Sequence, residues 1–296
     1  MNIHTIISYI LSKLFKSNDF QESQENNDLE TDSVINATNK LIEETKLEYS
    51  KFMNIDILPK CIVTYENVNS SVYIEYASVN IKSNGNNIFI NISNAFNSLP
   101  DIEKKAILFH EFTHAYDLIY SLEANIDLQQ KKDFMQTYSE YHAKIIEFMY
   151  RSDVKSISDS SSIPTDKKIF YQDNYYILDA VLSFIAKKVQ KSLFPNKSDL
   201  YNEDVISLKC HIIQKEIYYC LGALSFFSKY CTPYLSFSIN EFIGNAFGKF
   251  SNNILNVYTE LENYIPKTDS SEIITASNEL TCHLMRYLLD IYNNTN

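Results

Sequence analysis

The feature that most restricts how this chain can fold is a helical pattern centred on His110-Glu111-Phe112-Thr113-His114. Around it, apolar residues recur at steps of three and four from Ile102 to Tyr120, which is the period of one helix face. The preceding Ser98–Asp101 is typical of a helix start, with a proline in the first turn. We therefore predict a helix from about residue 101, with the two histidines on one face because they are four positions apart.

Two histidines one helical turn apart can direct imidazole nitrogens at the same point, where a metal ion would bind. Zn²⁺ accepts neutral imidazole nitrogen at about 2.0–2.1 Å in tetrahedral geometry, and catalytic zinc sites keep one position for water. Glu111 directly follows the first histidine, so its carboxylate could act as general base on that water. The alternative is an ordinary helix whose histidines bind nothing. The pattern favours Zn²⁺ as cofactor, His110 and His114 as ligands and Glu111 as the catalytic base.

A catalytic zinc site needs a third protein ligand, and the next predicted helix offers three candidates. Glu140 is favoured, because Ala143 follows on the same face and a small residue there would let this helix approach the first one closely. His142 is two positions away and points to the other side, so only one of these two can be a ligand. Glu147, seven positions after Glu140, is the remaining alternative.

Asp117 continues the stripe formed by His110 and His114. It lies about 10.5 Å along the helix axis from His110, too far for its short side chain to share the same metal ion. It could instead accept the second ring N–H of a ligand histidine and orient that ring. An exposed aspartate without such a function is the alternative.

Composition and charge narrow the classes of partner and compartment. The net charge of −11 and the absence of clustered Lys and Arg exclude a phosphate-binding surface, so we expect no nucleic-acid partner. The 5 cysteines form no C-x-x-C pair, which favours a reducing, cytoplasmic compartment. The oligomeric state is not predicted by any pattern in the chain.

The N-terminal region, residues 1–32, is expected to lie outside the folded core. Residues 3–15 are apolar but too short to span a bilayer, and they lack the features of a signal peptide, so we expect no stable membrane insertion. They could form an amphipathic helix that docks on the domain. Residues 16–32 are polar and acidic, which is typical of a linker.

A small antiparallel sheet is predicted ahead of the motif helix. Its strands are three segments rich in β-branched and aromatic residues, at 61–65, 71–81 and 87–92. Ser83–Asn87, between the last two, is typical of a hairpin turn. A helix over 33–53 precedes this sheet and should pack on it.

The rest of the chain predicts helices. A helix over 133–151 carries Glu140, and the Ser/Asp-rich segment 152–168 is typical of a mobile loop or a subdomain boundary. Residues 169–296 predict an all-helical C-terminal subdomain, with helices near 170–192, 200–231, 236–264 and 270–292. The predicted fold class is α+β, in which the sheet packs on the motif helix and the ligand helix, and the helical subdomain follows.

The motif at 110–114, followed by Glu140-Tyr-His-Ala143, resembles the zincin metallopeptidases of the gluzincin group. The order of short sheet, motif helix and E-x-x-A helix resembles the ImmA/IrrE-type family, and the resemblance covers about residues 33–151. It implies a compact zincin-like catalytic domain, with Glu140 as third zinc ligand and Glu111 as general base. It also implies a regulatory protein or repressor as substrate. The helical C-terminal half has no counterpart in this resemblance.

The leading functional hypothesis is therefore a zinc-dependent endopeptidase that hydrolyses a peptide bond in a protein partner. Stabilising the oxyanion would need a further donor, for which Tyr138, Tyr141 and Tyr171 are candidates. A second hypothesis is a non-catalytic zincin-like binding or regulatory protein that uses its helical C-terminal half. A third is a zincin toxin acting inside a host cell, which the lack of an export signal disfavours.

Overall fold

The computed structural model describes residues 30–293 except 57, 59, 67–75, 82–87, 124–125, 160, 173, 196–198, 201 and 232–237. The predicted N-terminal apolar segment and all but the end of the acidic linker therefore lie outside the described residues. Within the described residues, no helix combines the length and apolar composition needed to cross a bilayer.

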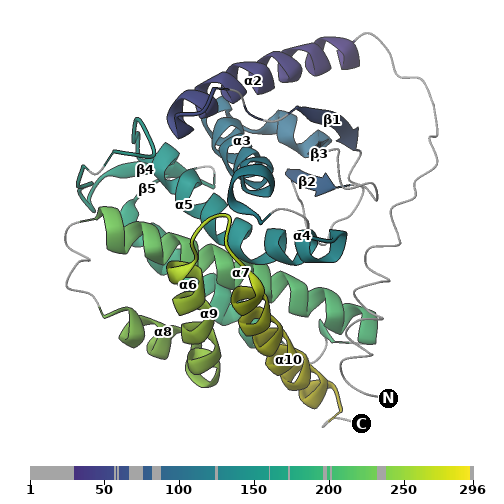
Figure 1. Ribbon diagram of the computed structural model, residues 1–296, viewed down its shortest axis with the longest axis vertical. Helices are drawn as coiled ribbons and strands as arrows, with labels where there is room; N and C mark the ends of the chain where they lie inside the picture. The colour runs from purple at the N-terminus through teal and green to yellow at the C-terminus, as the bar shows by residue number, and fades with distance from the viewer. Residues whose placement is uncertain are drawn as a thin grey trace.

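Helix α2 (Glu30–Met53) and a three-stranded sheet form one end of the molecule (Figure 1). The strands β1 (Cys61–Glu66), β2 (Ala77–Ile81) and β3 (Ile88–Ser93) lie in the order β1-β3-β2. Strand β2 is antiparallel to β3, whereas β1 is parallel to β3. The predicted purely antiparallel sheet is therefore wrong, because a strand pattern shows which face is buried but not which strands are neighbours. The predicted hairpin turn, Ser83–Asn87, lies wholly outside the described residues.

The motif lies in helix α3 (Asp101–Tyr116), as predicted. The helix begins directly after Pro100, without a side-chain cap; the Ser98 hydroxyl instead donates to the Ala95 carbonyl at 2.8 Å. On one face, the Phe109 ring packs edge-on against Tyr49 and Phe52 of α2, with centroids 5.3 and 5.6 Å apart. This buried aromatic cluster anchors α3 to α2 and leaves the histidine face directed toward α5.

The second predicted helix is interrupted and starts earlier than expected. Helix α4 (Leu128–Phe134) begins with a capping box between Asp127 and Gln130 and continues through a π-helical turn, η3 (Met135–Ser139), into α5 (Glu140–Arg151). A second π-helical turn, η2 (Asp117–Ser121), continues α3 at its C-terminal end. The two π-helical turns contact each other beside the histidines.

The C-terminal half is mainly but not wholly helical. It contains a hairpin and five α-helices among the described residues, namely β4 (Lys168–Tyr171), β5 (Asn174–Ile177), α6 (Leu178–Leu193), α7 (Glu203–Tyr230), α8 (Ile239–Phe247), α9 (Ser251–Asn263) and α10 (Ser271–Asn293). The all-helical prediction is wrong at the hairpin, where aromatic and β-branched residues pair across two short strands. The helix predicted over 236–264 is also broken, because Gly248 adopts a positive φ of 52° after α8.

Helix α5 lies between α3 and α7 and joins the two halves (Figure 1). Phe148 packs on Phe226 of α7 at a centroid distance of 5.5 Å. The segment predicted as a mobile loop, 152–168, bonds to both halves: the Ile157 N–H donates to the Phe52 carbonyl at 3.0 Å, and the Ile163 N–H donates to the Tyr230 carbonyl at 2.7 Å. Residues 33–151 and 169–296 therefore share one continuous core.

Candidate metal centre

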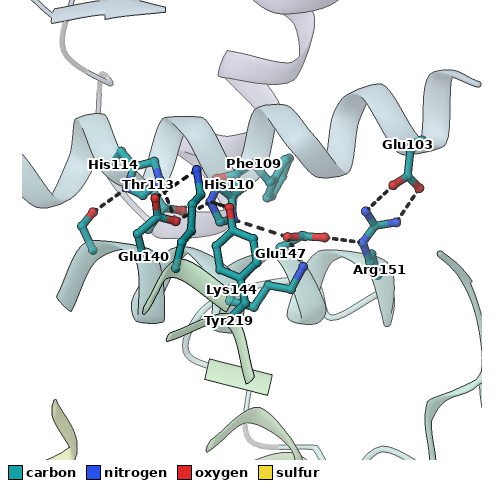
Figure 2. A network of polar contacts seen from close by, with 12 residues as sticks. Glu103, Phe109, His110, Thr113, His114, Glu140, Lys144, Glu147, Arg151 and Tyr219 are labelled. Carbon is teal, nitrogen blue, oxygen red and sulfur yellow. Dashed lines mark hydrogen bonds and ion pairs between the residues drawn. The ribbon is translucent and has the colours of Figure 1, made fainter. Parts of the chain in front are cut away.

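Helix α3 presents both motif histidines to the interface with α5 (Figure 2). His110 and His114 are 5% and 4% exposed, and their ring centroids are 4.9 Å apart. Glu111 lies between them in sequence and is also buried. Three polar side chains so deep in the interface require polar or metal partners, since burying them without partners would cost several kcal/mol.

Glu140, the first residue of α5, faces both histidines. Its Oε2 atom lies 3.3 Å from His110 Nε2 and 3.6 Å from His114 Nε2. One donor atom from each of the three residues lies within 4.8 Å of the other two. With metal–ligand bonds of about 2.0–2.2 Å, the donors of a tetrahedral site are about 3.3–3.6 Å apart. The spacing and the nitrogen–nitrogen–oxygen donor set therefore could hold a metal ion.

The electrostatics of the three residues also suit a cation. Burial alone would lower the pKa of His110, but the carboxylates of Glu140 and Glu147 raise it to about 9. Burial lowers the pKa of His114 to about 3, against the opposing effect of Glu140. Burial would raise the pKa of Glu140, yet Lys215 and the two histidines hold it below its usual range. The shifts of His110 and Glu140 reflect the attraction between an imidazolium and a carboxylate, and a bound cation would compete with the proton on His110.

The second ring nitrogen of His110 faces Glu147, one turn further along the interface (Figure 2). His110 Nδ1 lies 3.3 Å from Glu147 Oε2, an ion-pair distance without the alignment of a good hydrogen bond. Glu147 also accepts from Lys144 Nζ at 2.8 Å and from Arg151 Nε at 2.7 Å. Arg151 in turn donates two hydrogen bonds of 2.7 Å to Glu103. Glu147 is therefore placed to orient His110 from behind, and it is not one of the three converging ligands.

His114 is held by a hydroxyl instead. Its Nδ1 lies 2.8 Å from Ser139 Oγ, and the Ser139 hydroxyl donates to Asp117 Oδ2 at 2.9 Å. Since the serine proton is directed at the aspartate, Nδ1–H of a neutral His114 donates to Ser139, which leaves the Nε2 lone pair for a metal ion. Asp117 is fully buried, so it is not the exposed residue of the alternative prediction. It orients His114 through Ser139 and not by the predicted direct contact.

His142 is not among the three residues whose donor atoms converge. Its Nδ1 lies 2.8 Å from Asp117 Oδ1. The Asp117 carboxylate thus links His142, Ser121 and Ser139, with the Ser121 hydroxyl donating at 2.7 Å. Among the three candidates for third ligand, the structure brings only Glu140 together with both histidines.

Helix α7 contributes two groups that the sequence analysis did not find. Lys215 Nζ lies 3.3 Å from Glu140 Oε1, and the Tyr219 hydroxyl lies 3.5 Å from His110 Nε2. Figure 2 shows the Tyr219 side chain directed at His110 from the C-terminal half. A sequence signal was present, because Lys215, Tyr219 and Gly222 follow each other at steps of four and three, on one helix face.

Gly222 explains how α7 comes so close. A β-carbon built on it would meet the carbonyl oxygen of Tyr141 and lie 2.8 Å from Lys144 Cβ, so no larger residue fits without a shift of the helix. The close approach sets Tyr219, one turn earlier, over the histidines. The three tyrosines proposed from the sequence have other contacts: Tyr138 stacks on Phe134, Tyr141 binds Glu262 and Ser225, and Tyr171 lies under Lys144 and Arg151.

Comparison with protein-family models, curated proteins and solved structures found no match to this chain.

Proposed function

We propose that the protein is a zinc-dependent endopeptidase of the gluzincin type that hydrolyses a peptide bond in a protein partner. The observation that supports it is the convergence of His110, His114 and Glu140 at tetrahedral spacing, with Glu111 beside the first ligand. The resemblance to ImmA/IrrE-type peptidases, with a regulatory protein as substrate, is part of this proposal and is supported by the motif alone.

In this proposal each residue of the centre has a separate role in hydrolysis. A bound zinc ion would polarise the substrate carbonyl and acidify water. Glu111 accepts a proton from the attacking water as the water oxygen bonds to the carbonyl carbon. Glu111 then donates that proton to the leaving amine as the C–N bond breaks. The Tyr219 hydroxyl, which lies 3.5 Å from His110 Nε2, would donate a hydrogen bond to the oxyanion that forms. Glu147 and Ser139 keep the two imidazoles oriented.

The test separates metal binding from turnover. Purified protein should contain about one zinc per chain by mass spectrometry. Incubated with a mixed peptide library, it should release products, and Glu111→Gln should keep the metal while slowing cleavage by at least about 100-fold. Glu272→Gln, which changes an exposed glutamate on α10, is the matched control and should cleave like the parent. Protein that takes up no zinc, or a Glu111→Gln variant that cleaves normally, would rule the proposal out.

A second candidate is a zinc-binding regulatory protein without turnover. It is favoured by how thoroughly the centre is enclosed: His110, Glu111, His114 and Glu140 are each 8% exposed or less, and α7 packs Lys215 and Tyr219 against them. A centre enclosed in this way leaves little room for a polypeptide substrate to reach it. Stoichiometric zinc, a lower melting temperature after chelation and no product from any peptide would favour this candidate over the endopeptidase.

A further inference from the structure

The two oxygens of Glu140 have different partners. Oε2 faces the two histidines, at 3.3 and 3.6 Å, whereas Oε1 faces Lys215 Nζ at 3.3 Å. We propose that Lys215 is a positioning residue that holds Oε1 away from the metal position, so that Glu140 binds through one oxygen and the fourth position stays open. The inference rests on the metal centre proposed above and concerns its geometry.

The alternative that Lys215 prevents is a carboxylate that binds through both oxygens. A carboxylate can bind a metal ion through one or both oxygens, and a zinc ion can expand to five ligands. With both Glu140 oxygens bound, four protein atoms would surround the zinc and the position for water would be lost or crowded. The ammonium group of Lys215 gives Oε1 a partner of its own, which keeps the carboxylate turned toward one-oxygen binding.

The ion pair is sheltered enough to impose that orientation. The Glu140 side chain is 11% exposed and the Lys215 side chain 19%, so water screens their attraction much less than on an open surface. The Lys215 ammonium also lies 5.7 Å from the centre of the Tyr219 ring, a cation–π contact that restrains it on the same side of the centre. Lys215 is therefore held by two of the groups that surround the metal position.

Lys215 of α7 can reach Glu140 only because α7 packs so close to α5. Gly222 is seven positions after Lys215 on the same face and allows the contact with the Tyr141 backbone. The C-terminal half thereby takes part in the geometry of the centre, whereas the three ligands come from the N-terminal half.

The direction of the effect on metal affinity is what distinguishes this role from ordinary structural support. Lys215 repels a bound cation and competes for one Glu140 oxygen. Its removal should therefore leave zinc affinity equal to or higher than that of the parent, while the coordination number rises. A residue that merely held the fold together would lower zinc affinity when removed.

The experiment loads Co²⁺ in place of zinc and records visible absorption, which is stronger for four-coordinate than for five-coordinate cobalt. Lys215→Met should lower the molar absorption by about twofold or more while zinc affinity, measured by competition with a chromophoric chelator, does not fall. Lys215→Arg, which keeps the charge, should restore the parent spectrum. Lys188→Met is the matched control, since Lys188 pairs with Glu216 of α7 away from the metal ligands, and it should leave both readouts unchanged.

An unchanged cobalt spectrum in Lys215→Met, or a loss of zinc affinity in that variant, would overturn the inference. If Lys215→Met does not fold, Lys215→Gln removes the charge at similar length and carries the same comparison. Failure of the parent protein to bind zinc or cobalt would instead remove the proposed function, so the two failures can be told apart.

Discussion

The two histidines of the candidate metal centre are held by different kinds of surroundings. Behind His110 lies a buried network of charges, in which Glu147 contacts the ring and is itself paired with Lys144 and Arg151. Behind His114 lies a chain of hydrogen bonds in which Ser139 contacts the ring and Asp117 supports the serine. We call these the His110 side and the His114 side.

The difference follows from local helix geometry. On the His110 side, Glu140, Lys144, Glu147 and Arg151 occur at steps of four, three and four along the regular helix α5, so they share one face. On the His114 side, Asp117 and Ser139 belong to the π-helical turns η2 and η3, where the chain gains a residue and the face shifts. The regular helix α5 aligns charged side chains over several turns, whereas the π-helical turns η2 and η3 bring short side chains together at one point.

The largest expected effect tests the charged character of the His110 side. Arg151→Met removes the partner of two carboxylates, Glu103 and Glu147, whose side chains are 9% and 7% exposed. Because Glu103 loses its ion pair with Arg151 and Glu147 keeps only Lys144 of its two cationic partners on α5, the free energy of unfolding should fall by about 3–5 kcal/mol, measured by urea denaturation of the metal-free protein. Arg286→Met, at an exposed position on α10, should change it by less than about 0.5 kcal/mol. A loss of stability no greater than in this control would mean that the network is not a structural unit.

The contrast between regular helices and irregular or long-range structure also explains how much of the fold could be predicted. Helix α3 and the course of α2 follow from apolar residues at steps of three and four, and both are present. The local pattern predicts a helix at the hairpin of β4 and β5, because a short aromatic and β-branched segment fits either structure until its pairing partner is known. The parallel pairing of β1 with β3 depends on long-range contacts that no local pattern encodes.

At the candidate metal centre, the sequence predicts those residues whose positions follow from regular helix geometry. The spacing of His110 and His114, and the position of Glu140 on the next helix, led to the three groups that converge in the structure. The predicted direct contact of Asp117 with a ligand histidine holds only for a regular helix beyond Tyr116, whereas a π-helical turn begins there. Tyr219 and Lys215 were missed because their approach depends on how α7 packs on α5, which is a tertiary contact 75 or more positions away in the chain from Glu140.

The next largest expected effect is a loss of zinc affinity when the carboxylate behind His110 is removed. Glu147→Gln removes the carboxylate behind His110, and the loss of an orienting partner usually lowers metal affinity by about 10–100-fold. Glu103→Gln changes the far end of the same network, which contacts Arg151 but not the histidine, so zinc affinity should stay within about twofold of the parent. Chelator competition measures both variants. Equal losses in the two would show that the network acts on the fold as a whole and not on His110.

On the His114 side, Ser139→Ala should have a smaller effect, because a neutral hydroxyl is lost and the supporting carboxylate remains. We expect zinc affinity to fall by less than about tenfold and the free energy of unfolding by about 1 kcal/mol. Ser121→Ala is a close control: Ser121 also donates to Asp117, at 2.7 Å, but it does not contact His114. If Ser121→Ala lowered zinc affinity as much as Ser139→Ala, the relevant group would be the Asp117 carboxylate alone.

The smallest expected effect is the coupling between the two sides in the metal-free protein. Ser139→Ala and Glu147→Gln change residues with different partners, so their effects on the free energy of unfolding should add within about 0.5 kcal/mol. Ser139→Ala and Asp117→Asn change two residues joined by a 2.9 Å hydrogen bond, so that pair should depart from additivity by more than this. Strong coupling in the first pair would contradict the comparison. It would mean that His110 and His114, whose ring centroids are 4.9 Å apart, are held by one network that spans both sides.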